Sequence, residues 1–212
     1  MTRPLVIFGA GEYAEVACSY FSESGTHRVS AFTVDRKHIS ADNLSGLPFV
    51  PFEDVARLYP PDSHDFFVAI GYAQHNAIRR LKYETAKAMG YSMASYVSNN
   101  AIIHPNAQIG EHCFILETSV VEPFVRIGDN VTIWSGSIIG HYSTIASHCF
   151  LALRASVGGG TCIGEQCFMG VGATVRDHVS LGPRCIIGAG AVLLSDLDAD
   201  KCVHANGHIE PV

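Results

Sequence analysis

The sequence predicts a small α/β domain followed by a parallel β-helix, which is a coil of short strands wound on a fixed repeat. Three observations lead to this fold class. The second half of the chain repeats every six residues from Ile103 to about Asp198, whereas the first hundred residues alternate apolar runs with helical stretches. No long flexible linker separates the two parts. We therefore expect two domains, residues 1–98 and residues 99–212.

The repeat appears when the chain is written in blocks of six from Ile103. An amphipathic helix needs apolar residues about every 3.6 positions, and a half-buried strand alternates, so neither explains a strict period of six. Three blocks can close one triangular coil of short strands, which gives about five coils. The first position of every block is aliphatic or Met: Ile103, Ile109, Ile115, Val121, Ile127, Ile133, Ile139, Ile145, Leu151, Val157, Ile163, Met169, Val175, Leu181, Ile187 and Leu193.

Two further block positions have a restricted composition. The second position is Gly in half of the blocks, and we expect these glycines to adopt turn conformations that other residues resist. The fifth position is nearly always small and includes Cys113, Cys149, Cys167 and Cys185. We expect these thiols to point into the prism as small hydrophobes. Because the chain has no CxxC pair, we expect no metal site.

The N-terminal domain begins with a strand, a glycine-rich turn and a helix. The apolar run Leu5–Phe8 ends in Gly9-Ala10-Gly11-Glu12-Tyr13-Ala14, and a helical stretch continues to Phe21. A GxGxxA turn in this setting is typical of Rossmann-like domains, although it also serves tight strand-helix packing.

The remaining elements of this domain continue the α/β pattern. A second strand, residues 29–34, ends at Asp35 and Arg36, and a third, residues 65–70, ends at Gly71. A helix rich in Lys and Arg follows over residues 76–89, and a last strand, residues 91–97, leads into the first coil.

Ligands of such sheets bind at the carboxyl ends of the strands. That edge collects Gly9, Gly11, Glu12, Tyr13, Asp35, Arg36 and Gly71. The domain is too short for two mononucleotide-binding halves, so a nucleoside diphosphate, alone or attached to a sugar, fits better than a dinucleotide. The alternative is a small α/β domain without a ligand.

Composition excludes several classes of protein. The chain has 14 basic and 20 acidic residues among 212, without a basic cluster, which argues against a nucleic-acid partner. No apolar stretch approaches a membrane span, and the start does not resemble a signal peptide. We expect a cytoplasmic protein with no membrane association.

His141 is the best candidate for a catalytic residue on the prism. It occupies a turn position after Gly140, and Gly159 lies eighteen residues later, directly above it in the next coil. A neutral histidine can accept a proton near pH 7, and a backbone N–H beside it can stabilise an oxyanion. A solvated turn histidine is the alternative, and we expect His112 and His148 to be residues of that kind.

The order of the glycine-rich turn, Asp35, Gly71 and the hexads around His141 resembles the sugar O-acyltransferase family of sialic acid O-acetyltransferase type. The resemblance covers essentially the whole chain. This family includes N-acetyltransferases acting on nucleotide-linked 4-amino sugars. It implies a left-handed coil and a homotrimer, with acetyl-CoA bound along the β-helix between protomers. It also implies that the N-terminal domain binds the nucleotide of the sugar.

The resemblance assigns roles to individual residues. His141 is the general base, and the Gly159 amide contacts the acetyl carbonyl. Asp35 and the turn at residues 9–11 hold the nucleotide sugar, and Val171 and Ala189 line the pantetheine channel.

Two departures from the family pattern concern the surroundings of His141. The family commonly places an acidic residue after the catalytic histidine, whereas Tyr142 follows here, and a second histidine is replaced by Phe150. Tyr142 and Arg154 are candidate substrate contacts, although Arg154 is equally well explained as a solvated turn residue.

Three functions follow as hypotheses. The first is acetyl transfer from acetyl-CoA to the amino group of a nucleotide-linked amino sugar, within bacterial surface-glycan biosynthesis. The second keeps the site but changes the acceptor to a sugar hydroxyl, or the donor to a larger acyl-CoA. The lack of an acidic residue beside His141 slightly favours the amine. The third is a non-catalytic scaffold with a nucleotide-sensing domain.

Overall fold

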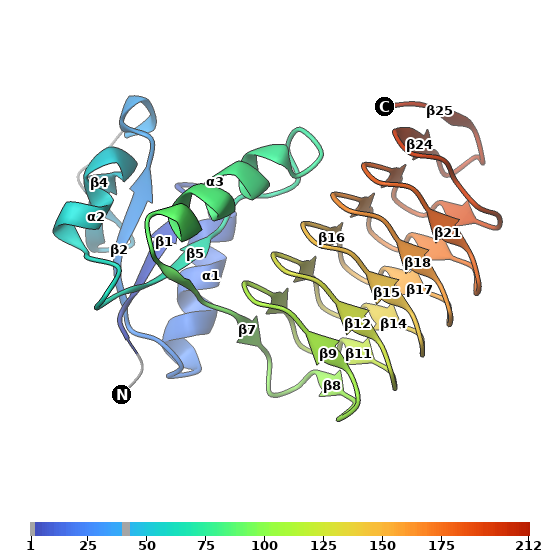
Figure 1. Cartoon of the computed structure of the whole chain (residues 1–212), viewed down its shortest axis with the longest axis horizontal. Helices are drawn as coiled ribbons and strands as arrows, with labels where there is room; N and C mark the ends of the chain where they lie inside the picture. The colour runs from blue at the N-terminus through green and yellow to red at the C-terminus, as the bar shows by residue number, and fades with distance from the viewer. Residues whose placement is uncertain (1–2, 40–42) are drawn as a thin grey trace. The chain divides into compact units, whose positions relative to one another are not determined.

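The computed structural model describes residues 3–39 and 43–212. The chain divides into two compact units, and each is considered by itself (Figure 1). Unit 1 comprises the chain up to Gly71 together with Ile78–Ala94. Unit 2 comprises Tyr72–Ala77 together with Ser95–Val212.

Unit 1 is an α/β domain built on a sheet of order β3-β4-β2-β1-β5-β6. The central strand β1 (Leu5–Phe8) pairs in parallel with β2 (Val29–Val34) and β5 (Asp65–Val68). All four residues of β1 are buried, as expected for a strand with both faces covered. The outer strands are β4 (Leu47–Pro51), β3 (Asn43–Leu44) and β6 (Ser92–Met93).

The helices of unit 1 agree with the sequence pattern. The principal helices are α1 (Glu12–Glu23) and α3 (Ala77–Ala88). Short turns of helix follow β2 and β4: η1 (Arg36–His38), η2 (Phe52–Asp54) and α2 (Val55–Leu58). No helix of the described residues is long and apolar enough to cross a membrane.

Unit 2 is a parallel β-helix with three sheets, which confirms the predicted fold class. From β7 to β23, paired strands of the prism are one coil apart, eighteen residues along the chain, as in Ile115↔Ile133. One sheet contains β7 (Tyr96–Val97), β10 (Phe114–Ile115), β13 (Thr132–Ile133), β16 (Phe150–Leu151), β19 (Phe168–Met169), β22 (Ile186–Ile187), β24 (Lys201–Val203) and β25 (Ile209–Pro211). The second contains β8 (Ile102–Ile103), β11 (Val120–Val121), β14 (Ile138–Ile139), β17 (Ser156–Val157), β20 (Thr174–Val175) and β23 (Val192–Leu193). The third contains β9 (Gln108–Ile109), β12 (Arg126–Ile127), β15 (Thr144–Ile145), β18 (Cys162–Ile163) and β21 (Ser180–Leu181).

The strand expected over residues 91–97 is two strands in two units. β6 joins the sheet of unit 1 beside β5, and β7 opens the first coil of unit 2 beside β10. Between them, the Ala94 N–H still donates to Phe66 O in unit 1, whereas the Ser95 hydroxyl accepts from Cys113 N in unit 2. The chain therefore changes unit between Ala94 and Ser95.

The interior of the prism matches the predicted ladder of large and small residues. Cys113, Cys149, Cys167 and Cys185 are fully buried. Each thiol contacts a carbonyl oxygen of the next coil, as in Cys149 Sγ to Gly164 O at 3.1 Å. Hydrogen bonding between thiols of the ladder, together with burial, raises the pKa of Cys167 and Cys185. These groups are therefore thiols rather than nucleophilic thiolates.

The expectation that second-position glycines supply left-handed turns is wrong. The left-handed residue is at the fourth position of the block, where Tyr142 has φ +60° and His148 has φ +67°. Where the second position is glycine, the next coil approaches its backbone closely. A Cβ on Gly140 would lie 2.6 Å from Gly159 N, and one on Gly164 would lie 2.6 Å from Pro183 N.

The expectation that His112 and His148 are solvated turn residues is wrong. They are 2% and 7% exposed. His112 Nδ1 lies 3.0 Å from Asn130 Oδ1, and Asn130 Nδ2 lies 2.9 Å from His148 Nδ1. Residues in the same left-handed position of successive coils stack along the corner, so polar side chains there bond to each other in a ladder.

The segment Tyr72–Ala77 packs within unit 2, which the sequence pattern did not indicate. Tyr72 lies against Phe168, with 4.2 Å between ring centroids. Asn76 Nδ2 donates to the backbone oxygens of Gln166 and Cys167, and Gln166 Nε2 donates to His75 O. This short segment therefore binds by hydrogen bonds to the corner of the prism that also carries His112, Asn130 and His148.

Candidate active site

The turn after β1 in unit 1 requires glycine at Gly9. Its φ is +148°, and a Cβ there would lie 2.7 Å from Ala69 O on the neighbouring strand. Gly11 precedes α1, and no atom lies within 4 Å of the place a Cβ would occupy; the same holds for Gly71 after β5. The carboxyl edge of the sheet therefore has open space at the start of a twelve-residue helix, the part of a helix that attracts anions.

Asp35 ends β2 at this edge and forms an ion pair with Lys82 of α3. The Lys82 ammonium also lies over the rings of Phe8 and Phe52, at 5.1 and 4.9 Å from their centroids. Arg36 turns away to Asp54, with 2.7 Å between Nη2 and Oδ2. Arg36 is thus engaged with η2, whereas Asp35 and Lys82 form a half-buried pair beside the end of β1.

The other predicted residues of the glycine-rich turn lie on the first turn of α1. Glu12 is exposed, and Tyr13 is half-buried with its ring edge-on to Phe67 at 6.4 Å between centroids. The structure therefore brings Gly9, Gly11, Glu12, Tyr13 and Asp35 to one edge of the sheet.

In unit 2, His141 lies on the corner between the sheets of β14 and β15, and it is paired with Glu122. Glu122 Oε2 accepts from the His141 backbone N–H at 2.8 Å and lies 3.0 Å from His141 Nδ1. The backbone and ring of His141 lower the pKa of Glu122 from its ordinary value, so this carboxylate is ionised at neutral pH. A carboxylate at Nδ1 holds the proton there and leaves Nε2 free to accept another.

Gly159 lies directly beside the His141 ring, as counting by eighteen predicts. A Cβ at Gly159 would lie 2.9 Å from His141 Nε2 and 2.7 Å from Cε1. Within residues 3–39 and 43–212, the Gly159 N–H has no hydrogen-bond acceptor. This glycine thus leaves the proton-accepting nitrogen accessible, with an uncommitted backbone donor next to it.

Tyr142 is 64% exposed and stacks on Phe124, with 4.7 Å between ring centroids. The two rings line a hollow of about 280 Å³ on the face of β12 and β15, together with Arg126 and Thr144. This hollow begins one residue from His141, so a ligand reaching the histidine can contact the aromatic pair.

Arg154 and Val171 share a different hollow, of about 440 Å³, on the face of β14, β17 and β20. Ala189 is exposed one coil beyond Val171 on the same corner. These three residues are on the opposite edge of that sheet from His141. The residues predicted on the prism therefore form two sets, one around His141 and one around Val171. The sheet of β14, β17 and β20 lies between them.

Two residues of the site were missed by the sequence argument. The expected lack of an acidic partner for His141 is wrong, because Glu122 takes that place. Glu122 lies one coil before Gly140 in the eighteen-residue column, and its carboxylate reaches the next residue, His141. Lys82 was visible only as one of several basic residues on a helix.

Three protein families match the sequence. The PglD N-terminal domain matches residues 4–86, the bacterial transferase hexapeptide (six repeats) matches residues 106–141, and the hexapeptide repeat of succinyl-transferase matches residues 160–195. Together these matches cover most of the chain. Comparison with curated proteins gives no match.

Solved structures resemble the chain over its whole length. The acetyltransferase domain of PglB from Neisseria gonorrhoeae FA1090 is 26% identical, with full coverage of both chains and a TM-score of 0.88. PerB from Caulobacter crescentus, solved with CoA and GDP-perosamine, is 27% identical over 98% of this chain and 97% of that one, with a TM-score of 0.87. WeeI from Acinetobacter baumannii AYE has the same fold at 20% identity, with a TM-score of 0.87.

Proposed function

Because the chain belongs to the hexapeptide-repeat acetyltransferases that carry an N-terminal PglD domain, we propose that it acetylates the amino group of a nucleotide-linked amino sugar. Acetyl-CoA is the donor. Two similar proteins support this choice: PerB was solved with CoA and GDP-perosamine, and the PglB domain was solved with acetyl-CoA. The observation that carries the proposal is the Glu122–His141 pair beside Gly159.

The proposed reaction is direct attack of the amine on the thioester. The neutral amine forms a bond to the acetyl carbon, and His141 Nε2 accepts the proton that the nitrogen releases. The Gly159 N–H donates to the oxyanion that develops on the carbonyl oxygen. The carbon-sulfur bond then breaks, and CoA leaves as a thiolate that takes up a proton. No covalent enzyme intermediate is needed.

In this mechanism Glu122 positions His141. Its hydrogen bond to Nδ1 fixes the ring orientation and keeps the acceptor nitrogen directed away from the carboxylate. The negative charge also stabilises the imidazolium that forms when His141 accepts the proton.

Unit 1 would hold the nucleotide. The pyrophosphate of the substrate fits the open N-terminus of α1 at Gly11, where helix N–H groups favour anions. Asp35 can accept hydrogen bonds from ribose hydroxyls, while its partner Lys82 adds positive charge. We assign Gly9 and Gly71 to the close backbone approach at this edge, with Glu12, Tyr13 and Arg36 as flanking residues.

For the donor, Val171 and Ala189 are the proposed lining of the pantetheine path. Both are exposed small or apolar residues on one corner, and Arg154 in the adjoining hollow can meet a phosphate or carboxylate. Tyr142 with Phe124 offers an aromatic surface to the sugar next to His141.

A sugar hydroxyl is the second candidate acceptor, and Glu122 is the observation that favours it. Hydroxyl attack demands more help from the base than amine attack. The earlier preference for an amine rested on a missing acidic partner, which Glu122 supplies. The preference for the amine now rests on the similarity to perosamine N-acetyltransferase.

The test is a His141→Ala variant assayed for CoA thiol release with a panel of UDP-, dTDP- and GDP-linked amino sugars and their hydroxyl counterparts. General-base catalysis contributes about 10²- to 10⁴-fold, so kcat should fall by about that factor. His178→Ala is the matched control, because His178 is an exposed histidine on the same corner, two coils further along. Its kcat should stay close to that of the parent.

Equal thiol release by His141→Ala and the parent would refute the general-base assignment. Turnover with hydroxyl sugars but not with amino sugars would replace the first acceptor with the second.

A further inference from the structure

The C-terminal residues, which have no hexapeptide repeat, form a hairpin that closes the last coil. β24 pairs in parallel with β22, and β25 folds back antiparallel on β24. In this register Cys202 lies directly opposite Glu210, and the His204 N–H donates to His208 O at 2.9 Å. Gly207, with φ +81°, forms the turn between the strands.

This register places four potential metal ligands on one face of the hairpin. Side chains two residues apart on a strand point the same way, and directly paired residues of antiparallel strands share a face. Cys202 and His204 are two apart on one strand, and His208 and Glu210 are two apart on the other. Val203 points to the other face and is 2% exposed, in the prism interior.

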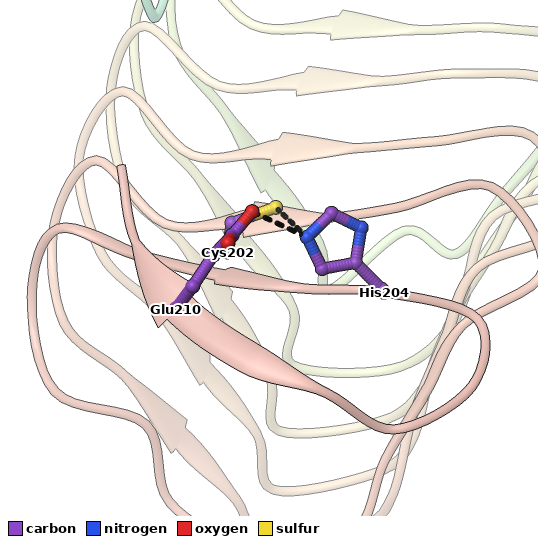
Figure 2. A group of neighbouring side chains, drawn as sticks. All are labelled: Cys202, His204 and Glu210. Carbon is purple, nitrogen blue, oxygen red and sulfur yellow. Dashed lines mark hydrogen bonds and ion pairs between the residues drawn. The ribbon is translucent and has the colours of Figure 1, made fainter.

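The functional atoms of this cluster converge. Figure 2 shows the ends of Cys202, His204 and Glu210 directed toward one another. Their potential ligand atoms all lie within 4.8 Å of one another. His204 Nε2 lies 3.8 Å from Cys202 Sγ and 2.7 Å from Glu210 Oε1. His208 Nε2 lies 3.8 Å from Glu210 Oε2, so it is next to the same carboxylate.

The distances suit zinc. Zinc bonds of about 2.3 Å to sulfur and about 2.1 Å to nitrogen place two tetrahedral ligands about 3.6 Å apart. The Cys202–His204 separation is close to this value, and the shorter His204–Glu210 contact needs only a small rotation of an exposed side chain to open. A set of one thiol, two imidazoles and one carboxylate favours zinc over calcium or magnesium, which take oxygen ligands.

We propose that Cys202, His204, His208 and Glu210 bind one Zn²⁺ ion that fastens β25 to β24. Four protein ligands leave no open position, so the site is structural rather than catalytic, and it is independent of acetyl transfer. The absence of a CxxC pair had argued against zinc. The ligands instead come as two pairs on facing strands, Cys-x-His and His-x-Glu, which only the hairpin brings together.

The experiment uses the full chain without a histidine tag, stripped with a chelator and titrated with Zn²⁺ against a chromophoric zinc indicator. We expect one ion per chain and a higher Tm with zinc, because the metal binds only the folded hairpin. Cys202→Ser and His204→Ala should each weaken binding more than about tenfold, since even outer-shell changes cost that much. Cys162→Ser and His178→Ala, at exposed positions elsewhere on the prism, are the controls and should bind as the parent does.

Co²⁺ supplies a second readout that separates a direct thiolate ligand from an indirect effect. The parent and Cys162→Ser should show sulfur-to-cobalt charge transfer, and Cys202→Ser should lose it. Failure of the parent to bind zinc stoichiometrically would overturn the site and leave the cluster as a set of exposed hydrogen bonds. Unchanged binding by Cys202→Ser and His204→Ala would do the same.

Discussion

At the scale of single residues, the side chain of Glu122 decides how His141 is presented to a ligand. The carboxylate binds both the backbone N–H and the ring Nδ1 of His141. The ring is thereby fixed against the bare surface of Gly159, with Nε2 exposed beside it. A sequence neighbour of the histidine is therefore not needed to orient it, since a carboxylate from the preceding coil does so.

Removing this charge should slow the chemical step more than it weakens binding. We expect Glu122→Gln to lower kcat by about ten- to a hundredfold, which is less than the loss of the base itself, and to change KM for acetyl-CoA little. Steady-state kinetics with both substrates varied would measure the two effects separately.

Asp177→Asn is the control for this change. Asp177 is an exposed carboxylate on the same corner as Glu122, and it lies 4.0 Å from the ring of His178 rather than His141. The Asp177→Asn variant should leave kcat unchanged. An equal loss in both variants, or a rise in KM alone for Glu122→Gln, would contradict the positioning role.

At the scale of elements, the turns of the prism use glycine for two different reasons. At the glycines of the second position, such as Gly140 and Gly164, the backbone of the next coil lies where a Cβ would be, so a side chain has no room at these places. The fourth position has a left-handed backbone but space around it, as at Gly172, where φ is +66° and nothing lies within 4 Å of a Cβ position. Residues that tolerate this conformation can therefore replace glycine at an open fourth position such as Gly172.

This difference predicts opposite outcomes for two glycine substitutions. Gly164→Ala should lower the free energy of unfolding by about 1–3 kcal/mol, because the Cβ would lie 2.6 Å from Pro183 N in the next coil. Gly172→Asn should change it by less than about 0.5 kcal/mol. Denaturant unfolding at a single protein concentration would measure both, and similar losses in the two variants would disprove the distinction.

At the scale of the whole molecule, one face of the prism exposes several apolar side chains, with the polar Ser156 and Thr174 among them. The sheet containing β8, β14 and β23 presents Ile102, Ile138 and Val192 outward, at 66%, 44% and 53% exposure. Val171 and Arg154 border the same face. Together with the family resemblance, this face supports the proposed homotrimer with the active site between protomers.

Light scattering coupled to size-exclusion chromatography would test the trimer. We expect a mass about three times that of the 22.8 kDa chain, because a second protomer can cover the apolar face and shelter the acyl donor. A charged substitution at the centre of the face, Ile138→Lys, should shift the mass toward the monomer. A monomeric parent at micromolar concentration would exclude a site shared between protomers.

The contacts that depend only on the repeat follow from the sequence alone. A strict period of six fixes which residues stack, because each coil repeats the one before it. The stacking of Gly159 on His141 and the buried thiol ladder could therefore be predicted by counting. The central strands β1, β2 and β5 and the helices α1 and α3 of unit 1 were also predictable, since apolar runs and a glycine-rich turn specify them locally, whereas β3 and β4 were not predicted.

The contacts of long polar side chains, and of segments outside the repeat, become apparent only in the folded chain. Glu122 reaches across to His141, Lys82 reaches Asp35 from 47 residues away, and Cys202 meets Glu210 through a hairpin without a periodic signal. The physical reason is that backbone stacking is set by the period alone. The direction of a carboxylate or ammonium depends on which partner lies within reach once the chain is folded.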